Sequence, residues 1–213
     1  MRTGAGRHFE VILFARHPEA GRVKTRLAKD LGNRNALRIY EALLAHTLET
    51  VRNSGYRNVL MVEPPDRTVD AGIWAPGMDS YLPQAPGDLG ARMSAAVKSA
   101  FARGAERVLL LGCDCPQISK ESVISSFKAL EACDVVLGPC VDGGYYLLGL
   151  KEERDSLFRS IPWSTGAVLE ATLNILKKQT LSYILQDKFS DVDTQEDFER
   201  VRHLEPLKHL GIR

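Results

Sequence analysis

The sequence predicts an α/β protein, built as a three-layer α/β/α sandwich around a mainly parallel, mixed sheet. Short apolar runs alternate along the chain with stretches in which apolar residues recur at helical spacing. The apolar runs lack the polar alternation of a strand with one solvated face, which is typical of parallel strands covered by helices on both sides. The chain has 213 residues, of which 44% are hydrophobic and 26% charged, and is long enough to bury a substantial core.

The expected elements follow one another in strand–helix order. Strands are expected at residues 9–14, 58–62, 79–82, 108–111, 135–137, 145–150 and 181–185, with 145–150 as the antiparallel member. Helices are expected at residues 35–52, 89–103, 119–132, 164–178 and 194–204. Gly55 and Gly104 are typical of positions just beyond a helix end, and Asp88 and Ser164 of N-caps. We expect one domain over residues 1–213, with residues 1–8 as a flexible tail.

Composition excludes several classes of protein. A formal net charge of +1 provides no strong field for nucleic acid. The first ten residues lack the apolar segment of a signal peptide, and no apolar run approaches the ~18 residues of a membrane span. We therefore expect a cytoplasmic protein with no nucleic-acid partner and no membrane span, and leave its oligomeric state open.

The four cysteines are expected to be reduced thiols, because the chain is large and has no secretory signal. Cys113 and Cys115 stand two apart, but no second pair of Cys or His residues at suitable spacing completes a zinc site.

Positive charge gathers in FARHPEAGRVKTRLAKDLG, residues 14–32, directly after the first expected strand. Ligands of open α/β sheets bind beyond the carboxyl ends of the strands. Backbone N–H groups, a hydroxyl and cations suit phosphates, although GRVKT lacks the second glycine of a Walker A loop. The alternative is a solvated basic loop. We interpret the segment as a phosphate-binding loop that uses Ala15, Arg16, Gly21, Lys24, Thr25 and Arg26.

Two acidic motifs also follow expected strands. Asp114, in GCDCP, follows strand 108–111, where a carboxylate can hold Mg²⁺ or Mn²⁺ together with substrate phosphates. The alternative is an Asp that caps the turn before Pro116. Asp191 and Asp193, in DVDTQEDF, follow strand 181–185 and are candidates to join Asp114 at the metal. Thr194 with Asp197 resembles a capping box, which explains neither Asp191 nor Asp193.

Two glycine-containing turns are further candidates for ligand contacts. In QAPGDLGARM, a turn at a helix N-terminus can receive an anion or the edge of a base, and the candidate residues are Gln84, Gly87, Gly90 and Arg92. In DGGYY, residues 142–144 form a turn through which the backbone can approach a ligand closely. A simple hairpin turn into strand 145–150 explains the second motif equally well.

Six motifs in a fixed order carry a resemblance to a known family: FARHPEAGRVKTRL, GDLGARM, GCDCP, DGGYYLLGL, WSTGAVLEATL and DVDTQEDF. From about residue 9 to residue 201, the chain resembles the bacterial radical-SAM/selenodomain-associated transferase 1 family, also described as arsenosugar-biosynthesis-type glycosyltransferases. The resemblance implies a GT-A-type nucleotide-diphospho-sugar transferase fold, related to phospholactate and molybdopterin guanylyltransferases.

The resemblance also implies roles for particular residues. The loop after the first strand would wrap the nucleotide phosphates, so that Lys24 and Arg26 act in catalysis together with Asp114. Asp114 and Asp193 would match the two metal carboxylates, with Asp191 as a possible third. We expect the acceptor to contact Asp142, Gly143, Gly144, Tyr145, Trp163 and Ser164.

The expected function is metal-dependent transfer from a nucleotide-activated small-molecule donor to an acceptor of unknown identity. Our first choice is glycosyl transfer from a nucleotide-diphospho-sugar, with Mg²⁺ or Mn²⁺ as cofactor. One alternative is a nucleotidyltransferase that joins an NTP to a phosphorylated acceptor and releases pyrophosphate. A non-catalytic nucleotide-binding module is the other. Asp114 is followed by Cys115-Pro116, where many glycosyltransferases of this fold have an Asp-X-Asp motif. The loop after the first strand reads ARHPEAGRVKTR, where many nucleotidyltransferases have AAGxGxR, so the type of transfer stays open.

Overall fold

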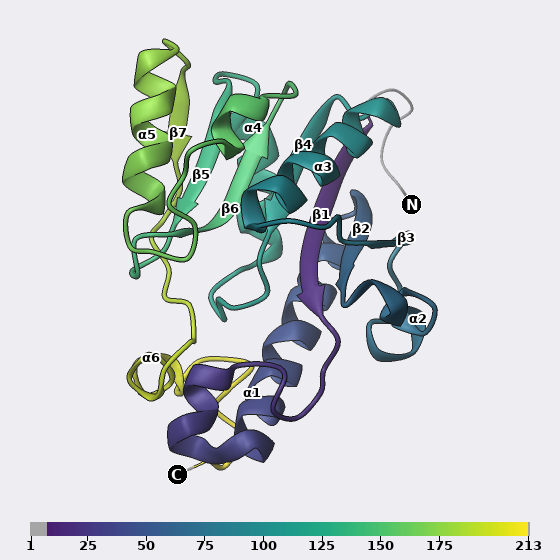
Figure 1. Ribbon diagram of the computed structural model, residues 1–213, viewed down its shortest axis with the longest axis vertical. Helices are drawn as coiled ribbons and strands as arrows, with labels where there is room; N and C mark the ends of the chain where they lie inside the picture. The colour runs from purple at the N-terminus through teal and green to yellow at the C-terminus, as the bar shows by residue number, and fades with distance from the viewer. Residues whose placement is uncertain (1–7, 213) are drawn as a thin grey trace.

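Seven strands form one sheet in the computed structural model, which describes residues 8–212 (Figure 1). Their order is β3-β2-β1-β4-β6-β5-β7, and β6 is antiparallel to both of its neighbours while all other pairs are parallel. The strands are β1 (Phe9–Arg16), β2 (Arg57–Glu63), β3 (Ser80–Pro83), β4 (Arg107–Leu111), β5 (Val135–Pro139), β6 (Tyr145–Leu150) and β7 (Tyr183–Leu185). The predicted mixed, mainly parallel sheet is confirmed, including its antiparallel strand.

Helices cover both faces of the sheet (Figure 1). They are α1 (Thr25–Asn53), α2 (Ala71–Trp74), α3 (Leu89–Ala102), α4 (Lys120–Ala129), α5 (Val168–Lys178) and α6 (Gln195–Val201), with short 3₁₀ helices at Pro65–Thr68 and Asp155–Phe158. Leu13 of β1 packs with α1 and α4, whereas its neighbour Ile12 packs with α3 and α5. Successive strand residues point to opposite faces, so the apolar runs of the strands build two cores and the predicted α/β/α layering is confirmed.

The strand directions bring distant loops to one edge of the sheet. β1, β4 and β5 run the same way, so the segments that follow them, 17–24, 112–118 and 140–144, leave from the same edge. Residues 186–194 return to this edge, because Phe189 bridges Cys140 and the Val192 N–H donates to the Asp114 carbonyl oxygen at 3.0 Å. α6 then packs Phe198 against the first part of α1. The basic loop and both acidic motifs therefore meet.

Several boundaries differ from the sequence-based expectation. α4 ends at Ala129 rather than at residue 132, α6 ends at Val201 rather than at residue 204, and β7 begins at Tyr183 rather than at residue 181. α1 begins at Thr25 rather than at residue 35, and Gly32, with φ +79°, interrupts it near the start. Ser164 does not cap α5: its φ is +64°, the N-cap is Ala167, three residues later, and the helix begins at Val168. Residues 1–7 of the expected tail lie outside the described residues. His8 is not part of a flexible tail, because its carbonyl oxygen accepts a hydrogen bond from the Glu106 N–H at 2.7 Å.

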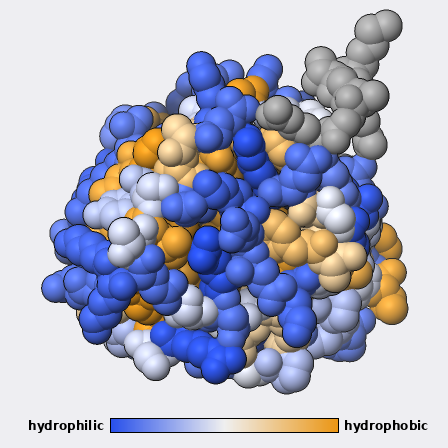
Figure 2. All heavy atoms as spheres, turned by 90° about the horizontal axis from the view of Figure 1, so that it is seen from above, coloured by the Kyte–Doolittle hydropathy of each residue, from blue (hydrophilic) through white to orange (hydrophobic). Residues whose placement is uncertain are grey.

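The opposite end of the molecule is mainly polar. Figure 2 shows this end as a mostly hydrophilic surface with separate hydrophobic groups. Beneath it, the buried Glu10 of β1 lies 3.2 Å from Arg57 Nε and pairs with Arg103, which compensates its charge. No helix within residues 8–212 combines the length and apolar character needed to span a membrane.

Candidate active site

Lys24 is the centre of the charged cluster at this edge. Its Nζ lies 2.5 Å from Asp114 Oδ1 and 3.0 Å from Asp193 Oδ1. The lysine side chain is only 4% exposed, whereas each carboxylate is 43% exposed. Burial by itself would lower the pKa of Lys24, but the attraction of Asp114 and Asp193 outweighs it, and the net effect is a raised pKa. The ammonium is therefore charged and held between two carboxylates at neutral pH.

Local backbone structure positions each member of this cluster. Lys24 adopts a left-handed conformation, with φ 47° and ψ 46°, immediately before α1 begins, which aims its side chain inward rather than along the helix. Asp114 lies three residues beyond β4. Asp193 precedes the capping box of α6, in which Thr194 and Asp197 bond reciprocally, and its own N–H donates to Asp197 Oδ2 at 3.2 Å. One strand end and two helix starts therefore fix the three charges.

The carboxylate pair has the chemistry of a divalent-cation site. Asp114 and Asp193 converge on one cation, the Lys24 ammonium, so their oxygens are no farther apart than the sum of their distances to Nζ. Both remain partly open to solvent. Mg²⁺ and Mn²⁺ are usually held by one or two carboxylates plus substrate phosphates, and these two residues fit that pattern. Asp191, the possible third ligand, instead lies beside Cys140 and Asp142.

Two clefts meet at this cluster. The larger, of about 510 Å³, runs over the carboxyl ends of β4 and β5 and is walled by side chains such as Phe14, Met93, Tyr145 and Trp163. The smaller, of about 240 Å³, is lined by Arg16, Arg22, Lys24, Thr25 and Arg26. Arg26, Asp114 and Asp193 line both clefts. A ligand with an anionic part and a less polar part can thus occupy both at once, with its junction at the cluster.

Arg16, Arg22 and Arg26 are the accessible cations of the smaller cleft, and Arg16 and Arg26 are the two that the sequence predicted as phosphate contacts. Arg26 is 67% exposed and lies 3.9 Å from Asp193 Oδ2. Arg16 donates from its guanidinium to the Arg22 carbonyl oxygen at 3.2 Å. The Tyr40 hydroxyl fixes the Arg16 backbone by accepting from its N–H at 2.8 Å and donating to its carbonyl oxygen at 2.6 Å. The guanidiniums of Arg16 and Arg26 can therefore bind phosphate without breaking a strong ion pair first.

The structure brings only some of the expected nucleotide contacts to the clefts. Gln84 donates to backbone carbonyl oxygens of Met61 and Ala15, and Arg92 contacts Gln84 and Glu63. These interactions occupy both side chains in holding β1, β2 and α3 together. None of Ala15, Gly21, Gln84, Gly87, Gly90 and Arg92 lines either cleft.

Gly90 contributes indirectly to the larger cleft. A Cβ at this position would meet the indole nitrogen of Trp163 at 2.3 Å and the Phe158 carbonyl oxygen at 2.6 Å. Its missing side chain therefore lets the Trp163 ring pack against α3, where the ring forms part of the wall.

The expected acceptor contacts lie together on the far side of the larger cleft. The cleft is lined by Asp142, Gly144, Tyr145, Trp163 and Ser164. The rings of Tyr145 and Trp163 pack edge to face, with their centroids 6.4 Å apart. Gly143 does not line the cleft. It has φ +89°, and its carbonyl oxygen accepts from the Leu169 N–H at 2.9 Å, which joins the turn to the start of α5.

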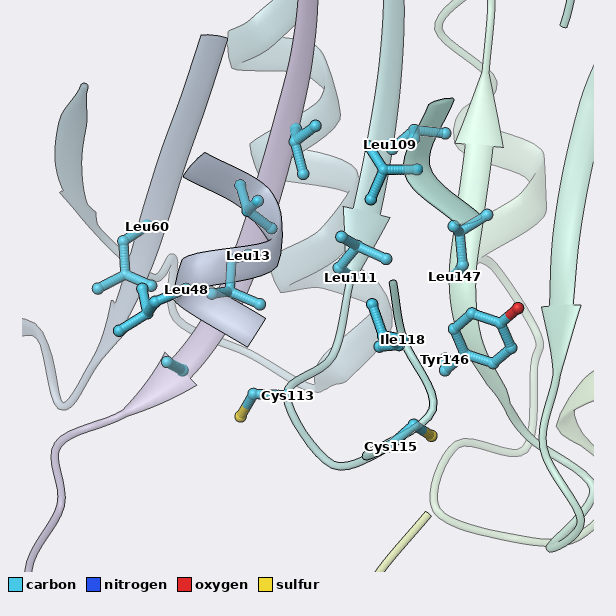
Figure 3. Packing of buried hydrophobic residues seen from close by; sticks show 14 of the residues in the cluster. Leu13, Leu48, Leu60, Leu109, Leu111, Cys113, Cys115, Ile118, Tyr146 and Leu147 are labelled. Carbon is cyan, nitrogen blue, oxygen red and sulfur yellow. The ribbon is translucent and has the colours of Figure 1, made fainter. Parts of the chain in front are cut away.

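Sequence reasoning missed two contributors to this region. Tyr40 has the spacing of a helix core residue, so its contact with Arg16 was not apparent. Cys140 lies in an apolar run, and only the sheet brings its Sγ to 3.7 Å from Cys115 Sγ. Cys113 lies on the other arm of the same loop, within hydrogen-bond distance of the Tyr40 hydroxyl; Figure 3 shows Cys113 and Cys115 apart, with Cys115 on the side of Tyr146.

The architecture is that of the nucleotide-diphospho-sugar transferases, with GT-A-like layering. The chain belongs to the bacterial family described as "Uncharacterized protein conserved in bacteria (DUF2064)", whose model matches residues 47–165. No protein of curated function matches its sequence.

Solved structures extend the likeness to nearly the whole chain. A protein from Desulfovibrio desulfuricans G20, provisionally named a nucleotide-diphospho-sugar transferase, is 29% identical with a TM-score of 0.84, over 89% of this chain and 84% of that one. The 4-diphosphocytidyl-2C-methyl-D-erythritol synthase of Anaerococcus prevotii DSM 20548 is 12% identical with a TM-score of 0.61, over 92% and 97%. Rv0371c from Mycobacterium tuberculosis H37Rv, in complex with manganese, is 18% identical with a TM-score of 0.56, over 92% and 98%. The last two likenesses concern the fold alone.

Proposed function

We propose that this protein is a metal-dependent transferase that uses a nucleotide-activated donor, foremost a nucleotide-diphospho-sugar. One observation carries the proposal: Lys24, Asp114, Asp193 and Arg26 form a single charged cluster where a small basic cleft meets a larger, partly aromatic one. The structural neighbour that is 29% identical is provisionally named a nucleotide-diphospho-sugar transferase, which supports the same class of function. Membership of the narrower radical-SAM-associated family remains part of the proposal.

The small cleft is suited to the diphosphate of the donor. Arg16 and Arg26 offer forked N–H groups, and Lys24 adds a point charge. These cations lower the energy of the negative charge that develops on the departing diphosphate, which is electrostatic stabilisation of the transition state. Arg26 acts at the junction, since it lines both clefts.

The metal would be held by Asp114 and Asp193. A bound Mg²⁺ or Mn²⁺ would neutralise phosphate oxygens and favour departure of the leaving group. The manganese in a protein of the same fold supports this choice of cofactor. Lys24 holds the two carboxylates in place and keeps their mutual repulsion low until a cation and phosphates arrive.

The larger cleft is suited to the transferred group and the acceptor. Tyr145 and Trp163 present ring faces and edges, which pack against the apolar faces of a sugar or another ring, while Asp142 and Ser164 offer polar contacts. The acceptor would therefore approach from the side of the 142–145 turn, opposite the basic cleft.

A turnover screen tests the proposal. The protein is incubated with Mg²⁺ or Mn²⁺ and panels of sugar nucleotides and NTPs. Release of free nucleoside diphosphate supports glycosyl transfer, release of pyrophosphate supports nucleotidyl transfer, and binding without turnover supports a nucleotide-binding module. Asp114→Asn should abolish turnover while circular dichroism stays unchanged. Asp30→Asn, at an exposed position on α1, is the matched control and should remain active.

A further inference from the structure

A second group of potential metal ligands lies in the wall of the larger cleft, apart from the Asp114–Asp193 pair. Ligand atoms of Cys140, Asp142 and Asp191 all lie within 4.8 Å of one another. Cys115 adjoins this group through Cys140, since its Sγ is 3.7 Å from Cys140 Sγ. All four residues line the cleft, and both cysteines are free thiols. Two thiols and two carboxylates therefore lie next to one another in one wall of the cleft.

The sulfur–sulfur distance matches a tetrahedral zinc centre. Two thiolates bound at ~2.3 Å to a tetrahedral Zn²⁺ lie about 3.8 Å apart, and the observed separation is 3.7 Å. Zinc binds carboxylate oxygens at roughly 2.0–2.2 Å, so the carboxylates of Asp142 and Asp191, which lie within 4.8 Å of Cys140 Sγ, would move toward the two thiols to complete four ligands. Mg²⁺ prefers oxygen ligands, whereas a mixed sulfur and oxygen set favours Zn²⁺.

The backbone holds the ligands in place before any ion binds. The Val192 N–H donates to the Asp114 carbonyl oxygen at 3.0 Å, and the Val141 N–H donates to the Phe189 carbonyl oxygen at 2.9 Å. Asp142 Oδ1 accepts from the Gly144 N–H at 2.8 Å, which orients this carboxylate. The segments after β4, β5 and β7 are thus tied together, and preorganised ligands bind a metal at lower entropic cost.

We propose that Cys115, Cys140, Asp142 and Asp191 form a zinc site distinct from the proposed catalytic pair. Binding one Zn²⁺ releases the protons of the two thiols. The bound ion links three segments that are far apart in the sequence. This metal cross-link fixes the conformation of the 140–144 turn and, with it, the wall of the larger cleft. The inference does not depend on the proposed transferase activity.

Cobalt substitution in the full-length, reduced protein tests the site. Co²⁺ should give a thiolate charge-transfer band and the strong visible bands of a tetrahedral centre, and one equivalent of Zn²⁺ should abolish both. Cys115→Ser and Cys140→Ser should lose the charge-transfer intensity. Each should weaken Zn²⁺ binding, measured against a chromophoric chelator, by at least the roughly 10- to 100-fold that loss of an outer-shell partner costs.

Two controls separate this site from its neighbours. Cys133→Ser removes a buried thiol that is not in the cleft wall and that lies within hydrogen-bond distance of the backbone carbonyl oxygens of Ala129 and Val135, and should keep the full spectrum. Asp193→Asn alters the proposed catalytic pair and should also keep the thiolate band. A reduced wild-type protein without this band, or a band that survives in both serine variants, would overturn the proposal.

A second measurement keeps the test decisive if the serine variants do not fold. Mass spectrometry of native wild-type protein, alkylated with and without Zn²⁺, should show slower modification of Cys115 and Cys140 with the ion present, and no change at Cys133. Equal rates at all three thiols, or a Cys115–Cys140 disulfide that persists in reductant, would count against the site.

Discussion

Replacing Lys24 with Met should destabilise the protein through the charge that it leaves behind. Met keeps most of the side-chain volume and removes the ammonium that contacts Asp114 at 2.5 Å and Asp193 at 3.0 Å. The two carboxylates then lose the counter-ion that they share, and the largely exposed Arg26 guanidinium, 3.9 Å from Asp193 Oδ2, remains nearby. A solvated basic loop would predict almost no effect on folding, but the 4% exposure of the lysine side chain contradicts that interpretation of Lys24.

The magnitude follows from the burial of the three groups. Removing one partner of a fully buried ion pair costs about 3–5 kcal/mol. Both carboxylates are 43% exposed, so water compensates part of the remaining charge, and a loss of ~2 kcal/mol in the free energy of unfolding is expected. Urea unfolding at pH 7 without divalent metal measures it. Lys29→Met, at an exposed position of α1, should change stability by less than about 0.5 kcal/mol.

Metal provides the second part of this test. Mn²⁺ can replace the missing ammonium, because a ligand that binds only the folded state stabilises it. Saturating Mn²⁺ should therefore stabilise Lys24→Met more than the wild type, in which the ammonium competes for the same oxygens. If Lys24→Met matched Lys29→Met in stability, or gained nothing more than the wild type from Mn²⁺, the pairing of Lys24 with the two carboxylates would be refuted.

Two further predictions concern the turn and the acid at the larger cleft. Burial, followed by the nearby Asp142, raises the pKa of Asp191 from 3.8 to about 6, so the folded state binds this proton more tightly and stability falls as the pH rises through that interval. Asp191→Asn should thus be ~1–2 kcal/mol more stable than the wild type above pH 6 and equal to it near pH 4, by urea unfolding; a difference that does not vary with pH would contradict this. Gly143→Ala should lower the free energy of unfolding by about 1–3 kcal/mol more than Gly55→Ala does. Both glycines have positive φ, but of the two only Gly143 has a backbone atom, the Gly166 carbonyl oxygen, 2.1 Å from where a Cβ would lie. Equal losses in the two variants would rule out the close approach.

The core of the fold could be predicted from local pattern. The apolar runs at β1, β4 and β5 are long enough and apolar enough to be buried on both faces, and the glycines beyond the helices mark their ends. The rule that ligands gather at the carboxyl ends of strands then pointed to Lys24, Asp114 and Asp193. The start of α1 was missed because residues 25–34 are largely polar, and their few apolar side chains pack against α6, which is distant in the sequence.

The sequence by itself determined the chemical groups of this protein and the edge of the sheet at which they lie, because strand patterns and loop charges are local properties. Only the tertiary structure decided which groups touch. Lys24 and Asp193 are 169 residues apart, and they meet because strand order and the packing of α6 on α1 bring their segments together. The same non-local contacts turned a loop lysine into a buried ion-paired one, and put Cys115 beside Cys140 rather than Cys113. Burial and pairing depend on the whole chain, so no short stretch of sequence specifies them.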